Sequence, residues 1–380
     1  MNHRQQCRNG PSCFYLAKSV CLFLHVRQEI KQGCGGDQKL ESSQRKTFDC
    51  LPKELKIEIF GFLVTKGERM DDAESICVVD QDYRSLATAA LVCREWRELA
   101  NDPILWMDMV LKIRGSSAGL GGVRSWRMIK RLWTMSRYSK VSRLVLRGVV
   151  FKRKMMKRLW RQVTARIRLG SISNLACVGQ SFTSIKTEEE RSELFGAMAR
   201  LNHLLIDTNY QDDENTLNDE QKTALFQEME RAIQQGSCKL ETLIIGSTNL
   251  SSLPLSTLAV VPPNLINLNI AMAILTKEQL DVLIPALISS SSLKHLNIEN
   301  SDLKFVDPKL LAKLVHKTKQ IFLDIAREDQ LEMVLRGCGS VGSKLEELTI
   351  YSSQGAVFRL EDGLLDRARA STVKVFIGRL

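Results

Sequence analysis

The sequence lacks the paired cysteine and histidine spacings of zinc-binding and disulfide-stapled proteins. Its ten cysteines never form Cys-x-x-Cys, and none flanks a histidine pair at zinc spacing. This scatter favours free thiols in a reducing compartment. One group near the N-terminus contains metal-ligating residue types, namely His3, Cys7, Cys13, Cys21, His25 and Cys34. Because an unstructured leader explains this group more simply than a site does, we predict no bound metal and no cofactor.

Signatures of catalysis are missing as well. The five histidines are dispersed, and the sequence contains no G-x-S-x-G, H-E-x-x-H, Walker A or protein-kinase motif. The glycine-rich segment 115–122, GSSAGLGG, is followed by no Lys-Ser or Lys-Thr pair and is preceded by no evident strand. It is therefore typical of a hinge and not of a phosphate-binding loop. The sequence predicts a protein without intrinsic catalytic activity.

No apolar run is long enough to cross a membrane. The longest run, from Phe14 to Val26, is interrupted by Lys18 and falls well short of the roughly 20 apolar residues that a spanning helix needs. The first 28 residues contain basic side chains and no acid, as organellar presequences do, but they lack a clear amphipathic pattern of arginine and serine. A presequence stays as the minor alternative. We expect a cytoplasmic or nuclear protein, or one present in both compartments.

Acidic residues are absent from one long segment. Between Met109 and Thr187 the sequence has 19 lysines and arginines and no aspartate or glutamate, while the whole chain carries a net charge of +11. A field of one sign over such a length attracts anions such as phosphopeptides, acidic protein surfaces or nucleic acid. A solvated flank without a partner explains the pattern equally well. Nucleic acid is the least favoured partner because the segment has no recognised nucleic-acid-binding module and no regularly interleaved aromatic residues.

What the sequence does contain begins with helical patterns near residue 50. The segment 48–63, FDCLPKELKIEIFGFL, has Pro52 in its first turn. Its large apolar residues fall on one helix face: Leu55, Ile59, Phe60 and Leu63. A second helical pattern, at 85–100, is apolar on several sides and is stopped by NDPILW at 101–106. Three short helices in about 60 residues cannot bury so much apolar surface alone, so we expect a protein partner.

These segments resemble an F-box. The similarity rests on LPKEL at 51–55, IEIF at 57–60 and LVCREWRELANDPILW at 91–106, which occur in that order. The segment 64–83 between the first two helices is longer than the tight turn that is usual in the family. Loops at such tips tolerate insertion, so the expected fold is unaffected.

The resemblance implies docking to the small Skp-type adaptor that links F-box proteins to the cullin of a ubiquitin ligase. It implies that the adaptor-binding residues are Leu51, Pro52, Leu55, Ile59, Leu91, Val92 and Cys93. The alternative is that these apolar side chains belong only to the core of the domain itself. Leu51 and Pro52 lie at an expected helix start, where an interface is the better interpretation.

The rest of the chain is repetitive. The pattern Leu-x-x-Leu-x-Ile occurs five times, and its middle leucines are residues 204, 243, 268, 296 and 348. Four degenerate copies have their middle positions at residues 144, 175, 323 and 375. Successive middle positions lie 25 to 39 residues apart, within or near the range of leucine-rich repeats. Between them the apolar period changes from 2 to 3.6, with helix starts at Thr276 and Asp307 and a helix end at Gly236. The sequence predicts nine strands that alternate with helices.

This pattern resembles the leucine-rich repeats of ribonuclease-inhibitor-like and F-box proteins. The predicted fold is therefore α/β, with a three-helix F-box followed by a curved leucine-rich-repeat solenoid that has a parallel inner sheet and outer helices. The predicted domains are a disordered or weakly structured leader (1–47), an F-box (48–110), a basic hinge or helical linker (111–140) and a repeat domain (141–380).

Side chains between the buried anchors of each strand line the inner, concave face of such a solenoid, and we predict that a protein substrate binds there. The predicted substrate-binding residues are Arg143, Arg147, His203, Asn267, Asn269, His295, Asn297, Phe322, Asp324 and Tyr351. Because both arginines belong to the first predicted strand, we expect an acidic or phosphorylated part of the substrate at that end. The competing interpretation places the substrate on a loop or on the convex side.

Two functions are compatible with these features. The first is a non-catalytic substrate-recognition subunit of an SCF-type cullin-RING ubiquitin ligase, which directs substrates to ubiquitin-dependent degradation. The second is a leucine-rich-repeat scaffold whose basic segment binds nucleic acid or another anionic partner. Binding to the Skp-type adaptor and cullin distinguishes the first from the second.

Overall fold

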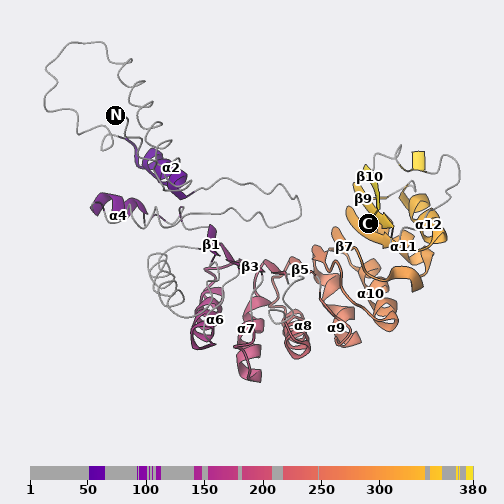
Figure 1. The fold of residues 1–380 in the computed structure, drawn as a ribbon, viewed down its shortest axis with the longest axis horizontal. Coiled ribbons are helices and arrows are strands. Elements are labelled where there is room, and N and C mark those ends of the chain that lie inside the picture. Colours follow the sequence, from indigo (N-terminus) through magenta and orange to yellow (C-terminus); the bar gives the residue numbers. More distant parts are fainter. Residues whose placement is uncertain are drawn as a thin grey trace, which may run out of the picture. The chain divides into compact units, whose positions relative to one another are not determined.

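The computed structural model describes parts of the predicted F-box and most of the repeats (Figure 1). The described residues are 51–64, 92, 94–100, 102, 105, 108–112, 141–147, 153–178, 182–207, 217–246, 248–338, 343–352, 365–366, 368 and 374–379. They belong to two compact units, one within residues 51–105 and one from residue 108 to residue 379. The interpretations of the leader, of most of the 64–83 insert and of the glycine-rich hinge lie outside the described residues.

The N-terminal unit contains the described helices α2 (Lys53–Val64) and α4 (Arg94–Ala100). They pack through Phe60, whose side chain is only 1% exposed. The Phe60 ring meets the Trp96 ring at a centroid distance of 5.3 Å and an interplanar angle of 76°, the edge-to-face arrangement that aromatic pairs favour. The apolar pattern therefore yields a small closed core between two helices that are far apart in the sequence.

Two ion pairs supplement this aromatic contact. Lys56 is buried, and its ammonium nitrogen lies 2.5 Å from a carboxylate oxygen of Glu95. Lys53, one turn earlier, lies 3.2 Å from the carboxylate of Asp102. A buried ammonium group is tolerated because it is paired, so the Lys56 contact fixes how α2 and α4 face each other.

The second unit is built on one ten-stranded parallel sheet in which each strand pairs with the next strand in the chain. The strands are β1 (Asp108–Lys112), β2 (Arg143–Arg147), β3 (Asn174–Val178), β4 (His203–Asp207), β5 (Thr242–Gly246), β6 (Asn267–Asn269), β7 (His295–Ile298), β8 (Gln320–Ile325), β9 (Glu347–Ser352) and β10 (Lys374–Arg379). The nine predicted strands are β2 to β10. Strand β1 was not predicted, because it follows the F-box pattern directly and lacks a leucine-anchor triplet of its own.

Helices line one side of this sheet, as Figure 1 shows for α6 to α10. The helical segments of this unit are α6 (Arg153–Arg168), α7 (Glu188–Met198), α8 (Asp219–Gln234), α9 (Leu255–Val260), η4 (Pro262–Asn264), α10 (Lys277–Ser289), η5 (Leu303–Phe305), α11 (Pro308–Lys317) and α12 (Glu328–Cys338). The predicted helix starts are confirmed, since Thr276 and Asp307 cap α10 and α11. Strand followed by helix, repeated with the strands always adjacent, is the architecture of a leucine-rich-repeat solenoid.

The apolar anchors form a continuous core between the sheet and the helices. The middle anchors Leu204, Leu243 and Leu348 are fully buried. The early repeats also use aromatic residues, because Trp160 stacks on Phe182 at a centroid distance of 4.8 Å. Each repeat thus buries its apolar face against the next one, which explains why the repeats depend on one another.

Strand β8 corrects one detail of the predicted repeat pattern. The sequence suggested Gln320, Leu323 and Ile325 as the anchors of that repeat. The strand register instead pairs Ile321 with Leu296 of β7 and with Leu348 of β9, so Ile321 is the middle anchor. The predicted middle anchor, Leu323, is two residues later than the observed one. Because side chains alternate along a strand, a shift of two residues leaves each side chain on its predicted face. The exception is Gln320, which was predicted to be a buried anchor.

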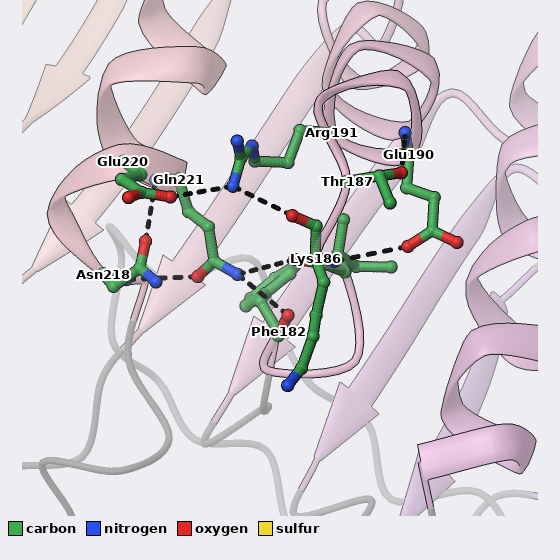
Figure 2. A network of polar contacts seen from close by, with 9 residues as sticks. Phe182, Lys186, Thr187, Glu190, Arg191, Asn218, Glu220 and Gln221 are labelled. Carbon is green, nitrogen blue, oxygen red and sulfur yellow. Dashed lines mark hydrogen bonds and ion pairs between the residues drawn. The ribbon is translucent and has the colours of Figure 1, made fainter.

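Three buried glutamines tie helices to the loops of the repeat before. Gln221, Gln279 and Gln330 are each the third residue of their helix, α8, α10 and α12. Each amide nitrogen donates two hydrogen bonds, of 2.8 to 3.3 Å, to main-chain carbonyls of the loop that leads into the preceding helix. Figure 2 shows Gln221 between its capping partner Asn218 and the carbonyl of Phe182. The loop carbonyls are thereby satisfied without water.

Candidate functional site: an apolar F-box surface and a polar concave sheet face

The predicted adaptor-binding residues are accessible where the structure describes them. Leu55 is 45% exposed and Val92 is 62% exposed, while Pro52 is exposed and Leu51 is half-buried. Leu91, Cys93 and the side chain of Ile59 lie outside the described residues. Leu55 and Phe60 were predicted to share one face of the helix, and of the two Phe60 is buried while Leu55 is exposed. Exposed large aliphatic side chains beside a closed core are typical of an interaction surface.

The described strands place nine of the ten predicted substrate-binding residues on the same face of the sheet. This is the face opposite the helices, and its residues form three rows that cross the strands. The first row precedes the middle anchors and consists of Arg143, Asn174, His203, Thr242, Asn267, His295, Gln320, Glu347 and Lys374. The predicted residue Arg147 lies in β2, but its side chain is not described.

Hydrogen bonds connect neighbouring members of the first row. Asn267 donates to the hydroxyl of Thr242 at 2.9 Å. The Nδ1 atom of His295 lies 2.5 Å from the amide oxygen of Gln320, and the amide nitrogen of Gln320 donates to Glu347 at 3.3 Å. This chain of side-chain contacts links the first-row residues of β7, β8 and β9.

The second row follows the middle anchors and changes character along the sheet. It consists of Val145, Ala176, Leu205, Ile244, Asn269, Asn297, Phe322, Thr349 and Phe376. Its first three members are buried, so strands β2 to β4 offer little accessible surface there. In the later strands Phe322 is half-buried and Phe376 is 54% exposed. Accessible aromatic area on this face therefore lies on the last three strands.

Two predicted contacts in the second row also have a structural role. The side-chain oxygen of Asn269 accepts a hydrogen bond from the amide of Ala271 at 3.0 Å, and that of Asn297 accepts one from Glu299 at 2.9 Å. These local turns fix the strand ends. Each of the two oxygens thereby uses one of its two lone pairs within the chain.

The third row contains two acidic residues, of which the sequence analysis selected Asp324 and missed Glu299. Asp324 pairs with Tyr351 across β8 and β9, and Glu299 follows the end of β7 directly. Burial, and then the negative charge of Asp324, raise the pKa of Glu299 above its usual value. Glu299 lies outside the anchor triplet, so the repeat pattern gave no reason to select it. Gln320 was missed for a different reason, the shifted anchor assignment.

The outer surface of α6 is strongly basic. Its exposed side chains include Arg153, Lys154, Arg158 and Arg161, and none of these four has an acidic partner among the described residues. By contrast, Arg168 pairs with Glu193 at 3.1 Å. The excess charge found in the sequence is thus concentrated, within the described chain, on one helix surface that is free to attract anions.

Neither a metal centre nor a membrane helix is found in the described part of the chain. No group of three or more His, Cys, Asp or Glu residues there could hold a metal ion, and the metal-ligating types near the N-terminus lie outside it. None of the described helices is long and apolar enough to span a bilayer.

Comparison with known proteins identifies the N-terminal unit. Residues 48–112 match the model of the F-box-like family. No curated protein matches the sequence. Similar solved structures include the leucine-rich-repeat protein LegL7 of Legionella pneumophila (15% identity, 61% of this chain and 72% of that chain, TM-score 0.35). A Bacteroides fragilis protein is also similar (14% identity, 74% and 76% of the two chains, TM-score 0.41).

These structural similarities are weak, and the repeat architecture rests on the strand register described above. The family match covers the segment whose motifs resemble an F-box, and the solenoid follows it directly in the chain. The chain therefore combines an F-box-like domain with a leucine-rich-repeat solenoid.

Proposed function

We propose that this protein is the substrate-recognition subunit of an SCF-type cullin-RING ubiquitin ligase. Its F-box binds a Skp-type adaptor that links it to a cullin, and its repeats bind the substrate. Ubiquitin transfer is carried out by other subunits, so no residue of this chain is catalytic. The contribution of this chain is proximity, because a bound substrate presents its lysines at high effective concentration.

One observation supports this proposal most strongly. Leu55 and Val92 are exposed although Phe60, in the same small unit, is 1% exposed. Within the described part of this unit, the core closes around Phe60 and Trp96 and leaves these two aliphatic side chains outside it. Covering them with an adaptor removes apolar area from water, which is worth about 25 cal/mol per Å².

Co-purification with the Skp-type adaptor and cullin tests the proposal. Replacing Leu51 and Pro52 by alanine should abolish adaptor binding while the repeats stay folded, as judged by circular dichroism. Glu58→Ala, an exposed change on the same helix, is the matched control and should bind normally. Undiminished binding by the double variant would show that the F-box has no adaptor function.

We further propose that the substrate is a protein that lies along the described concave face. The predicted residues from Arg143 to Tyr351 form its contact strip, with an acidic or phosphorylated part of the substrate near Arg143 and Arg147. Amide and aromatic side chains suit an extended peptide, because aromatics supply area and amides supply directional hydrogen bonds.

We also propose the domain limits predicted from the sequence and a location in the cytoplasm or nucleus. The free thiols Cys177, Cys238 and Cys338 fit a reducing compartment. Strand β1 crosses the proposed boundary at residue 110 and pairs with β2 of the repeat domain, so the first strand of the sheet begins before the segment 111–140 that we propose as the linker.

A second function, binding of nucleic acid or another anion, is favoured by the basic surface of α6. Replacing Arg158 and Arg161 by glutamate should then release nucleic acid and reduce the salt dependence of its binding. Retention of nucleic acid at low salt by a chain that binds no adaptor would favour this function over the ligase role.

A further inference from the structure

A small pocket lies between α7 and α8, toward the C-terminal ends of both helices. Its volume is about 170 Å³, below the roughly 300 to 1,000 Å³ of pockets for drug-sized molecules. On the α7 side it is lined by the short residues Ser192, Gly196 and Ala197. A methyl group at Gly196 would lie 3.2 Å from a carboxylate oxygen of Glu228, so the short residues leave room between the helices. The size suits one small chemical group.

Arginines from three successive helical segments line this pocket, which is called the arginine pocket below. They are Arg168 at the end of α6, Arg200 just after α7, and Arg231 in the last turn of α8. Figure 1 shows α6, α7 and α8 in sequence along the same side of the sheet. The side chains of Arg168 and Arg231 are 49% and 56% exposed, and Arg200 is exposed as well. All three guanidinium groups are therefore within reach of a ligand from solvent.

Most hydrogen-bond donors of these arginines are unused within the described chain. Arg168 donates from one terminal nitrogen to Glu193 at 3.1 Å, and Arg231 donates from one terminal nitrogen to Glu228 at 2.5 Å. The side chain of Arg200 has neither an ion pair nor a hydrogen bond among the described residues. Because a guanidinium group carries several N–H donors in a rigid fork, each of the three has donors left for a ligand.

The pocket carries an excess of positive charge. Glu228 is the acidic residue among those that line it, and its charge is balanced by Arg231. Arg168 is balanced by Glu193, which leaves the charge of Arg200. Arginines near the C-terminal end of a helix also interact favourably with its dipole. That role requires neither a pocket nor the convergence of three guanidinium groups, whereas an anionic ligand uses both.

We propose that the arginine pocket binds a phosphate group. Guanidinium groups bind phosphate through forked, charge-assisted hydrogen bonds. The hydroxyl of Ser192 makes no hydrogen bond within the described chain and supplies a further donor. The recognition chemistry is the same for inorganic phosphate and for a phosphorylated side chain of a protein. The site lies on the helical side of the sheet, so the proposal depends neither on adaptor binding nor on the concave strip.

Isothermal titration calorimetry of the full chain with inorganic phosphate, at an ionic strength held constant with sodium chloride, tests the proposal. We expect saturable binding. Arg200→Gln should weaken it by about tenfold or more, because hydrogen bonds to charged groups are lost, and Ser192→Ala should weaken it less. Arg161→Gln is the matched control. Arg161 is also exposed and has no acidic partner in the described chain, so this variant loses the same charge outside the pocket and should bind phosphate as wild type does.

A phosphoserine flanked by two glycines on each side, and the same peptide without phosphate, separate the two sources. Tighter binding of the phosphopeptide than of inorganic phosphate assigns the pocket to a phosphorylated protein side chain. Equal or weaker binding assigns it to inorganic phosphate or a small phosphate ester. The proposal is wrong if the folded wild-type chain shows no saturable binding of either phosphate probe. It is also wrong if Arg200→Gln binds phosphate as wild type does, or if Arg161→Gln weakens binding as much as Arg200→Gln.

Discussion

The amide nitrogen of Gln279 in α10 donates a 2.9 Å hydrogen bond to the carbonyl oxygen of Leu250, 29 residues earlier in the chain. A second bond of 2.9 Å reaches the carbonyl of Leu253, and the amide oxygen accepts from the main chain of Thr276. One side chain therefore caps its own helix and holds the loop of the neighbouring repeat. In a solenoid, such contacts between neighbours supply the coupling between repeats.

We expect Gln279→Met to lower the free energy of unfolding by about 2 to 4 kcal/mol, because two buried carbonyls lose their donor and the helix loses half of its capping box. Urea unfolding followed by circular dichroism measures the change. Gln234→Ala is the control, since the Gln234 amide is exposed and makes one long contact of 3.4 Å. A loss of stability below about 0.5 kcal/mol, the range of ordinary surface changes, would show that the hydrogen bonds of Gln279 are dispensable.

The repeat architecture could be predicted because its signals are local and periodic. The anchors and the capping sequences around Thr276 and Asp307 specify strand faces and helix starts within a few residues of each other. The hydrogen bonds from the three buried glutamines to the neighbouring repeats could not be predicted in the same way. Gln279 was recognised as a capping residue, but its amide acts on carbonyls more than 25 residues away. That contact depends on how the repeats stack.

Two helix glycines should respond differently to alanine. A methyl group at Gly196 would meet only the carboxylate end of Glu228 at 3.2 Å, whereas at Gly337 it would meet the main-chain oxygen of Ala312 at 3.2 Å. The helix-propensity gain of roughly 1 kcal/mol should therefore appear at Gly196, where a side chain can move. At Gly337 it should be cancelled because α11 must shift. Thermal unfolding of both variants checks this, and equal shifts in melting temperature would contradict it.

The three described cysteines should differ in reactivity. Cys177 and Cys338 are buried, and burial raises the pKa of the Cys338 thiol to about 12 and that of Cys177 further still. Cys238 is only half-buried, and its pKa is raised less. Since the thiolate is the reactive form, maleimide labelling at pH 7.5 should modify Cys238 first. Mass spectrometry of the labelled peptides measures the order in which the cysteines react. In denaturant the three cysteines should react at similar rates.

Residues 1–47 should be dispensable for folding and adaptor binding, because no periodic apolar pattern there connects to either unit. Deleting them should leave the melting temperature and the adaptor affinity unchanged. A lower value of either quantity would mean that the leader is part of one of the units.

The candidate site was predictable only in outline. Alternation along the strands indicated which residues face the concave side, and the register confirms that Asn267, His295 and Phe322 do. The sequence did not indicate that Asn269 and Asn297 use their side-chain oxygens to fix strand ends. Nor did it indicate that Glu299 and Asp324 interact, because that proximity arises from two separate repeats.

The last prediction concerns the basic end of the concave face. Arg143 and Arg147 are the first-row and third-row residues of β2, and both carry guanidinium groups that bind phosphate in a forked geometry. If the acidic or phosphorylated part of the substrate lies there, Arg143→Glu with Arg147→Glu should weaken capture more than an exposed rim charge does, by well over the 0.2 to 1 kcal/mol of such pairs. The control is Arg158→Glu with Arg161→Glu, which makes the same charge change on α6.

Substrates identified after proteasome inhibition supply the ligand, and binding is compared at low and high salt. Phe322→Ala with Tyr351→Ala should also weaken capture, since the far end of the same substrate contacts β8 and β9. A deficit confined to the β2 and the aromatic variants supports an extended substrate on the concave face. If the β2 variants, the aromatic variants and the α6 control all capture substrate equally well, the substrate binds a loop or the convex side. A deficit in the α6 variant alone would assign recognition to the basic helix, because only that surface would then distinguish the two charge reversals.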